Sequence, residues 1–291
     1  MQIQKSFSGD TDGTVYVVPT PIGNLDDITM RALKTLEEVD VIAAEDTRNT
    51  RKLLRHFDVP TPLVSYHEHN KKSRGQELLA RLEKGESIAV VSDAGMPSVS
   101  DPGEELVQAA IEAEHPVVVL PGANAALCAL VGSGLAAGEF LFYGFLPRKT
   151  KDKKAELDRL KSIQATLIFY ESPYRVKDTL KALHMHVGNR RITVARELTK
   201  RFEEYARGTA EELIEWTDSV ELKGECCLVM EGASSDTVQA DDLWWSGMSI
   251  AQHVTHYIQE EDLTSKDAIK RTATDRNLAK REVYQAFHID S

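Results

Sequence analysis

The fold class of this 291-residue chain is indicated most clearly by Ser87-Ile-Ala-Val-Val91 and by the segment directly after it, Ser92-Asp-Ala-Gly-Met-Pro-Ser98. Its first part is short, apolar and rich in β-branched residues, which is typical of a strand buried on both faces. Its second part is rich in polar residues, Gly and Pro, and predicts a loop after that strand. The pattern recurs at Thr14-Val-Tyr-Val-Val18, Asp40-Val-Ile-Ala-Ala44 and Pro116-Val-Val-Val-Leu120, and more weakly at Pro62-Leu-Val-Ser-Tyr66.

Helical spacing fills the intervals between these runs. Ile28, Ala32 and Leu36 fall on one helical face, and Leu78 and Leu82 fall on another. Strands that alternate with helices form βαβ units, so we predict an α/β fold with a mainly parallel sheet in the first half of the chain.

The composition changes at Gly132-Ser-Gly-Leu-Ala-Ala-Gly138, which we interpret as a hinge between two α/β lobes. The second half has strand patterns near 140–145, 165–170, 191–195 and 225–231. From Ser249 onward only helical patterns occur, and they predict a small helix-turn-helix-like tail. The expected organisation is a disordered lead (1–13), a first lobe (14–133), a second lobe (140–233) and a helical tail (241–291).

Charge is unevenly distributed along the chain. The 35 Lys and Arg against 46 Asp and Glu give a net charge of −11, which argues against a histone-like basic protein. Basic residues nevertheless cluster at 48–55, 148–161, 190–201 and 266–281. Such clusters are often only solvated helix faces, but local Lys and Arg are also what phosphate contacts require, so a local polyanion groove is predicted.

Three features bear on the cellular compartment. Three cysteines without CxxC spacing offer no disulfide framework and fit a reducing environment. There is no apolar run of the length that a membrane span needs, and the polar start of the chain lacks the apolar core of a signal peptide. We therefore expect a cytoplasmic protein with no membrane partner.

Every early strand pattern is followed by a polar or Gly/Pro segment. In an open parallel sheet, ligands bind at the carboxyl ends of the strands, so these segments should line one rim. Gly95 and Gly122 would let backbone approach a ligand closely, and the helix after Gly122 would offer free N–H groups. Neither GxGxxG nor GxxxxGK[ST] occurs, so hydride transfer and NTP hydrolysis lose their usual support.

Two further clusters have open interpretations. Glu45-Asp46-Thr47-Arg48 follows a buried strand and could hold a hydroxyl or act as a base, or could simply be an acidic helix start. His67-Glu68-His69 and His184-Met185-His186 have no third and fourth ligand at recognisable spacing, so no metal site is expected.

A set of ordered motifs between about Tyr16 and Gly232 resembles the tetrapyrrole-methylase superfamily of S-adenosylmethionine-dependent methyltransferases. Within it, the motifs are similar to the branch that methylates the 2′-oxygen of a cytidine in ribosomal RNA. These motifs are Val18-Pro-Thr-Pro-Ile-Gly-Asn-Leu25, Ala44-Glu-Asp-Thr-Arg48, His67-Glu-His-Asn70, Val91-Ser-Asp-Ala-Gly-Met-Pro97, Ser100-Asp-Pro-Gly103, Leu120-Pro-Gly-Ala123, Gly144-Phe-Leu-Pro147, Tyr170-Glu-Ser-Pro173 and Ala195-Arg-Glu-Leu-Thr-Lys200.

The resemblance implies a two-lobed fold with a mixed sheet in the second lobe, a homodimer, and S-adenosylmethionine bound in the cleft between the lobes. The implied partner is 16S rRNA in the small ribosomal subunit, modified at a cytidine ribose in the decoding region. The cofactor-binding residues carried over by motif, or expected on the same rim, are Pro21, Asp93, Ala94, Gly95, Met96, Pro97, Gly122, Asn124, Ala125, Tyr170 and Glu197.

A ribose hydroxyl is a poor nucleophile at neutral pH, so a proton acceptor is expected beside it. Glu45 and Asp46 are the two candidates, which the sequence does not rank. Arg48 would orient carboxylates or a phosphate, and His67 and Glu68 are reserves.

Aromatic and guanidinium planes can stack unpaired bases, and Tyr66, Tyr174 and Arg175 are candidates, unless the tyrosines pack in the core or at a dimer seam. The tail could grip a second RNA element or cap the dimer. Two other functions stay open: a tetrapyrrole C-methyltransferase, and a non-catalytic RNA-binding factor of ribosome assembly.

Overall fold

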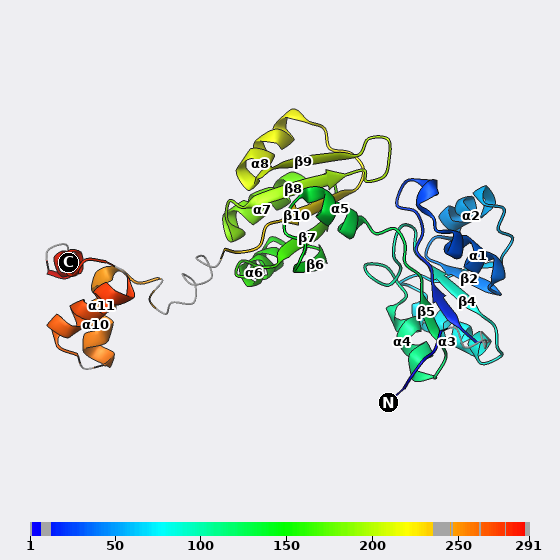
Figure 1. The fold of residues 1–291 in the computed structure, drawn as a ribbon, viewed down its shortest axis with the longest axis horizontal. Helices are drawn as coiled ribbons and strands as arrows, with labels where there is room; N and C mark the ends of the chain where they lie inside the picture. The colour runs from blue at the N-terminus through cyan, green and yellow to red at the C-terminus, as the bar shows by residue number, and fades with distance from the viewer. Residues whose placement is uncertain are drawn as a thin grey trace. The chain divides into compact units, whose positions relative to one another are not determined.

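The computed structural model of the chain describes residues 2–6, 13–234, 245, 247–261, 263–276 and 278–288. By its contacts the chain divides into two compact units, one of residues 1–161 and 165–232, the other of residues 162–164 and 233–291 (Figure 1). The first unit holds both α/β lobes, and the described residues of the second form three helices.

The first lobe is a parallel five-stranded sheet in the order β3-β2-β4-β1-β5. Its strands are β1 (Val15–Val17), β2 (Val41–Ala44), β3 (Leu63–Ser65), β4 (Ile88–Val91) and β5 (Val117–Val119). Its helices are η1 (Leu25–Asp27), α1 (Met30–Glu38), α2 (Thr47–His56), α3 (Lys71–Leu82) and α4 (Glu104–Glu112). The predicted parallel sheet is therefore confirmed.

Both faces of this sheet are covered, which is why its strands are apolar throughout. Leu36 of α1 and Leu54 of α2 pack on one face with Val18. Leu78 of α3 and Leu106 of α4 pack on the other. The consequence is that only the ends of the strands are open, and their polar loops gather at the carboxyl edge.

The second lobe is a mixed five-stranded sheet in the order β6-β7-β10-β8-β9, with β6 parallel to β7 and the other pairs antiparallel. Its strands are β6 (Phe140–Phe145), β7 (Thr166–Glu171), β8 (Arg191–Arg196), β9 (Glu204–Thr209) and β10 (Cys226–Met230). Its helices are α5 (Ala125–Ser133), α6 (Thr150–Leu160), α7 (Val176–Val187) and α8 (Ala210–Ser219). The sequence patterns missed β9, an edge strand of partly exposed residues with Gly208 near its end.

Helix α5 packs on the second sheet through Ala129 and Leu130, and Ile22 from the loop after β1 joins the same apolar cluster as Leu198. The two lobes thus share packed side chains within one unit. Several residues of this cluster, among them Ile22 and Leu198, also line the cavity described below.

The second unit contains α10 (Ile250–Glu260), α11 (Ser265–Asp275) and α12 (Lys280–His288), and it has a core of its own. Val254, Tyr257 and Val283 are buried in that core. Residues 1 and 7–12 of the expected disordered lead lie outside the described residues. In the described part, the side-chain nitrogen of Gln4 donates to the carbonyl of Val117 at 2.8 Å, and the side-chain oxygen of Gln4 accepts the N–H of Val117 at 2.9 Å. The boundaries proposed for the lead, lobes and tail stay predictions.

No helix among the described residues is long and apolar enough to cross a membrane.

Candidate functional site

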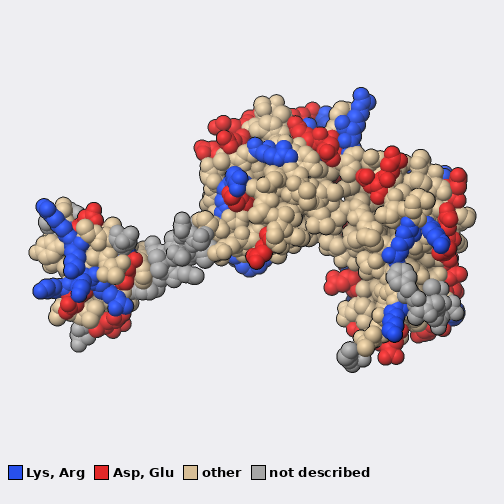
Figure 2. Space-filling view, in the orientation of Figure 1, with Lys and Arg blue, Asp and Glu red and all other residues tan. Residues whose placement is uncertain are grey.

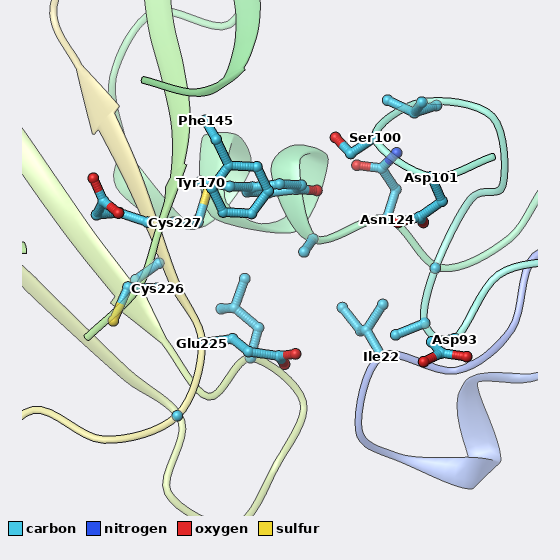
Figure 3. A pocket seen from close by; sticks show the side chains of 18 of the residues that line it. Ile22, Asp93, Ser100, Asp101, Asn124, Phe145, Tyr170, Glu225, Cys226 and Cys227 are labelled. Carbon is cyan, nitrogen blue, oxygen red and sulfur yellow. The ribbon is translucent and has the colours of Figure 1, made fainter. Parts of the chain in front are cut away.

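A cavity of about 450 Å³, here called the main cavity, lies between the two lobes of the first unit (Figure 3). This volume is in the range of small-molecule binding sites. Its lining residues come from the loops after β1, β4 and β5 and from the ends of β6, β7, β8 and β10. They are Ile22, Asp93, Ala94, Gly95, Met96, Val99, Ser100, Asp101, Asn124, Ala125, Phe145, Tyr170, Glu171, Ser172, Pro173, Ala195, Leu198, Gly224, Glu225, Cys226 and Cys227.

The first-lobe wall of the main cavity is set by backbone geometry. Gly95 has φ of +81°, a conformation that side-chain-bearing residues rarely adopt. Thr20 and Gly95 exchange two backbone hydrogen bonds of 3.0 and 2.9 Å, which fasten the loop after β1 to the loop after β4. The hydroxyl of Ser92 donates within the same loop, to the carbonyl oxygens of Ala94 or Gly95 at 3.3 and 3.2 Å.

Asn124 contributes a helix start to the same wall. It is the N-cap of α5, and its side-chain oxygen accepts the N–H of Leu127 at 3.1 Å. A helix N-terminus carries unpaired N–H groups and a partial positive charge, which favours polar or anionic ligand groups. The first lobe therefore offers hydrogen-bonding backbone to whatever occupies the main cavity.

The second-lobe wall is largely apolar and aromatic. The ring of Tyr170 lies 5.0 Å from that of Phe142 and 5.7 Å from that of Phe145, centroid to centroid. Figure 3 shows Tyr170 and Phe145 on the side opposite Asn124 and Asp101. Burial raises the pKa of Tyr170 to about 12, so its hydroxyl stays protonated at neutral pH.

Two buried cysteines complete this wall. Burial raises the pKa of Cys226 to about 11 and that of Cys227 to about 12, so both are neutral thiols. Both are buried, and both are among the lining residues of the main cavity. Neutral thiols behave as small apolar groups rather than nucleophiles.

Three carboxylates lie close together in the first lobe, where Asp93 and Asp101 line the main cavity and Glu45 lies near them without lining it. Glu45 follows β2, Asp93 follows β4, and Asp101 lies in the loop that leads to α4. Burial raises the pKa of Glu45, and the charges of Asp101 and Asp93 raise it further. Burial likewise raises the pKa of Asp101, with Asp93 adding to the effect. Glu45 and Asp101 thus hold protons more tightly than ordinary carboxylates do.

Asp46, next to Glu45 in sequence, has a different environment. Its side chain caps α2 by accepting the N–H of Arg48 at 2.8 Å, and it forms an ion pair with the guanidinium of Arg48 at 2.6 Å. These hydrogen bonds lower the pKa of Asp46 to about 2. Of the two adjacent acids, Asp46 serves the helix start and Glu45 belongs to the acidic cluster.

The strand order explains which predicted residues come together. Going from β3 to β5 along the carboxyl edge, the loops carry His67, Glu45, Asp93, Pro21 and Gly122 in turn. Seven of the eleven predicted cofactor residues line the main cavity: Asp93, Ala94, Gly95, Met96, Asn124, Ala125 and Tyr170.

The other predicted residues lie around the main cavity or away from it. Pro21 lines a neighbouring cavity instead, and Pro97 and Gly122 are not among the lining residues. Glu197 contacts the wall indirectly, since an added Cβ on Gly224 would collide with its carboxylate. These are placements only, and the roles of these residues stay predictions.

The two reserve residues sit at the far end of the edge. His67 follows β3, separated from β4 by β2, and Glu68 pairs with Lys71 at 2.9 Å. No cluster of three or more metal-ligating side chains occurs in the part of the chain that the structure describes.

Two of the three side chains suggested to stack on RNA bases, Tyr66 and Arg175, already make contacts within the fold. Tyr66 is only 2% exposed, because it packs in the core between β4 and α3. Arg175 donates to the carbonyl of Leu146 at 3.2 Å and lies 3.3 Å from the buried carboxylate of Glu171. Tyr174, in contrast, is 91% exposed.

Several lining residues escaped the sequence reasoning, notably Asp101, Phe145 and Glu171. Asp101 stood in the motif Ser100-Asp-Pro-Gly103 and carried no assigned role. Phe145 follows a register shift between Phe142 and Gly144 in β6, so simple alternation does not predict its side.

Comparisons with known proteins agree with this architecture. The sequence profile of the Tetrapyrrole (Corrin/Porphyrin) Methylases matches residues 14–214. The chain is 53% identical, over 98% of both chains, to a Bacillus subtilis protein described as ribosomal RNA small subunit methyltransferase I. Among solved structures, a diphthine synthase aligns with a TM-score of 0.62 at 13% identity, covering 78% of this chain and 94% of that one. A Thermus thermophilus uroporphyrin-III C-methyltransferase complexed with S-adenosyl homocysteine aligns with a TM-score of 0.54 at 21% identity, covering 75% and 97%.

Proposed function

Because the chain belongs to the tetrapyrrole (corrin/porphyrin) methylase family, we propose that it methylates the 2′-hydroxyl of a cytidine ribose in the decoding region of 16S rRNA. The full-length similarity to the Bacillus subtilis relative carries the choice of small-subunit rRNA. The likeness to the tetrapyrrole and diphthine enzymes concerns the fold alone, at 21% identity or less.

S-adenosylmethionine is the cofactor of this family, and the main cavity fits it. The cavity combines one wall of backbone and polar groups with one wall of aromatic and thiol groups, as a ligand with both polar and apolar parts requires. At Gly95 a Cβ would come within 3.2 Å of Ile22, so glycine keeps that part of the wall open. When bound, the cofactor supplies an activated methyl group on its sulfonium.

The chain's own residues then have two tasks, positioning and proton transfer. The fastened loops after β1 and β4 hold the first-lobe wall in one geometry, and correct alignment alone can supply much of a displacement reaction's acceleration. Asp93 and Asp101 line the cavity and Glu45 lies near them, and a carboxylate there can accept the proton of a ribose hydroxyl.

We assign the proton acceptor to Glu45 or Asp101 rather than to Asp46. The carboxylate of Asp46 is held by Arg48, which makes it a weak base. Glu45 and Asp101 have raised pKa values and are closer to the operating pH that favours general-base catalysis. Arg48 accordingly orients Asp46 and the start of α2.

The chemistry is tested by mapping the modified nucleoside. Small subunits from cells that lack this activity are incubated with labelled S-adenosylmethionine and the protein, and the rRNA is digested to nucleosides. We expect the label in 2′-O-methylcytidine from the decoding region. Label on a base, or label transferred only to a tetrapyrrole, would contradict the proposal; donor binding without any transfer would favour a non-catalytic assembly factor.

The assignment of the base is tested by single-turnover methylation. We expect one of the two variants Glu45→Gln and Asp101→Asn to transfer the methyl group about 10²- to 10⁴-fold more slowly than the wild type while still binding the cofactor. Asp46→Asn is the matched control, and we expect its transfer rate to change by much less. Near-wild-type rates for both Glu45→Gln and Asp101→Asn would exclude Glu45 and Asp101 as the proton acceptor.

We also propose that the protein is a cytoplasmic homodimer that binds RNA directly. Helix α5 supports the dimer because Leu127 and Val131, one turn apart on it, are 48% and 75% exposed. Light scattering should report a dimer for the wild type and a monomer for Val131→Glu. A cytoplasmic location follows if assembling small subunits are the substrate.

A further inference from the structure

A second cavity, here called the side cavity, lies beside the main one and has a volume of about 360 Å³. The loop after β1, helix α2 and the loop after β4 line it. Its residues are Thr20, Pro21, Gly23, Leu25, Asn49, Thr50, Lys52, Leu53, His56, Ser92 and Asp93.

The two cavities meet at one residue. Asp93 lines both, while the segment from Thr20 to Gly23 separates them, with Pro21 on the side cavity and Ile22 on the main cavity. The carboxylate of Asp93 is fixed by α2, since it accepts the backbone N–H of Asp46 at 3.1 Å and the amide of Asn49 at 3.3 Å. A strand of RNA whose ribose reached the acidic cluster would therefore have the side cavity next to it.

Helix α2 carries a row of cations next to the side cavity, and Lys52 of that row lines the cavity. Arg48, Arg51, Lys52 and Arg55 follow the i, i+3, i+4, i+7 spacing and so share one face. All four are exposed, and only Arg48 has an ion pair among the described residues. We call Arg51, Lys52 and Arg55 the α2 cation row.

Helix α3 has comparable charge but a different environment. Three of its four cations have ion pairs: Lys71 pairs with Glu105, Arg74 pairs with Glu77, and Arg81 lies 3.1 Å from Glu86. Cations that are already paired offer little to an external anion. Cations left unpaired beside a cavity are typical of phosphate contacts.

The lining of the side cavity matches the other parts of a nucleotide. Pro21, Leu25 and Leu53 supply apolar surface, and the ring of His56 can stack on a base. The side-chain nitrogen of Asn49 donates to Asp93, and its side-chain oxygen can accept from a base edge. Single-stranded RNA is bound in this way, with bases on apolar or ring surfaces and phosphates on Lys and Arg.

We propose that the side cavity binds the base of an RNA nucleotide adjacent to the acceptor, while the α2 cation row holds the neighbouring phosphates. This inference rests on the proposed function and deepens it by assigning a substrate subsite. It follows that RNA affinity and cofactor affinity depend on separate residues of the first lobe.

The first test measures binding of fluorescein-labelled 16S rRNA, transcribed in vitro, across a salt series. The triple variant Arg51→Gln/Lys52→Gln/Arg55→Gln is compared with Lys34→Gln/Lys84→Gln/Lys181→Gln, which removes the same charge from exposed sites outside both cavities. Each lost phosphate contact lowers the slope of log affinity against log salt by about 0.7 to 0.9. We expect the α2 variant to lose about 2 to 3 in slope and about tenfold in affinity, and the control to lose little.

Cofactor binding, measured by calorimetry, should be unchanged in both triple variants, which shows that they are folded. The inference is overturned if the α2 variant binds RNA like the control while the wild type still binds and methylates. If the wild type itself shows no salt-dependent RNA binding, the proposed function fails together with this inference.

The second test locates the RNA without any variant. Transcripts containing 4-thiouridine are photo-crosslinked to the wild-type protein, and the attached peptides are identified by mass spectrometry. Crosslinks in Thr47–His56 or Thr20–Leu25 support the subsite. Crosslinks confined to other segments, or crosslinks abolished equally by a small excess of heparin and of RNA, would show only a general polyanion surface and would overturn it.

Discussion

The two lobes contribute different kinds of wall to the main cavity. The first lobe uses backbone: a glycine at positive φ, a pair of loop-to-loop hydrogen bonds and a helix start. The second lobe uses side chains, with Tyr170, Phe145 and two cysteines against the same space. Substitutions should therefore act through backbone conformation in the first-lobe wall and through side-chain volume in the second-lobe wall. Figure 2 shows that acidic and basic side chains are interspersed on the visible face of both lobes, so surface charge alone does not distinguish them.

The largest effect is expected at the glycine of the first-lobe wall. Gly95→Val forces a β-branched residue into φ of +81°, and strain of about 1–3 kcal/mol is typical of such backbone conformations. We expect cofactor affinity, measured by calorimetry, to fall about tenfold to a hundredfold. Gly75→Val is the matched control, because an added Cβ at Gly75 in α3 meets nothing within 4 Å. A dissociation constant of Gly95→Val within threefold of the wild type would show that the first-lobe wall does not depend on this backbone conformation.

A smaller effect is expected on the second-lobe wall. Tyr170→Ala removes the ring that packs between Phe142 and Phe145, and should weaken cofactor binding by about tenfold through lost apolar contact. Met96→Ala on the opposite wall should change it by less than about threefold, because that wall acts through backbone. Equal losses in the two variants would show that both walls bind through side chains.

The acidic cluster predicts a pH effect of known sign. Burial and neighbouring carboxylates raise the pKa values of Glu45 and Asp101, so the methylation rate should rise with pH through a range above that of an ordinary carboxylate. Asp101→Asn removes one neighbouring charge, so if Glu45 is the base the acid limb of the rate profile should move to lower pH. An unchanged limb in a variant that stays active would assign the rise to another group.

The same shifts bear on stability. A carboxyl whose pKa is raised on folding makes the folded protein less stable as pH rises past its unfolded pKa, and the loss is complete above the raised pKa. At neutral pH, Glu45→Gln and Asp101→Asn should therefore each raise the melting temperature. Asp46→Asn should not, because the pKa of Asp46 is lowered and its charged form is the stabilised one. Calorimetric melting curves at pH 7 check both signs.

The smallest effect separates the cysteines. Cys128 is exposed, whereas Cys226 and Cys227 are buried with raised pKa values of about 11 and 12. Iodoacetamide at pH 8 should label Cys128 in the folded protein and all three after unfolding in urea, as read by peptide mass spectrometry. Rapid labelling of Cys227 in the native state would mean that the second-lobe wall opens.

Most of the first lobe was predictable because its strands have a recognisable sequence pattern. Continuous apolar runs rich in β-branched residues, such as Ile88–Val91, are typical of strands buried on both faces of a sheet. In a parallel sheet the polar loops that follow such strands lie at one edge. The second lobe was harder, since β9 has partly exposed residues and lacks such a run. The position of Phe145 in the cavity wall depends on the register shift in β6, which the local sequence pattern does not predict.

The candidate site was predicted in the same uneven way. Residues of the loop after β4 were identified from their position after a buried strand, but Glu45 and Asp46 were not distinguishable from sequence. What separates them is the N-cap geometry of Asp46 and its pairing with Arg48, which depend on where α2 starts. Likewise the basic runs at α2 and α3 are similar in composition, and only their ion pairs tell them apart.

The backbone bridge between Thr20 and Gly95 has a consequence for how ligand affinity arises. Two hydrogen bonds already join these loops in the folded chain. The conformational entropy of these loops is therefore lost on folding and not on ligand binding. A preorganised surface of this kind needs no closing motion on the first-lobe side. Heat capacity and entropy of ligand binding should accordingly reflect desolvation far more than loop ordering.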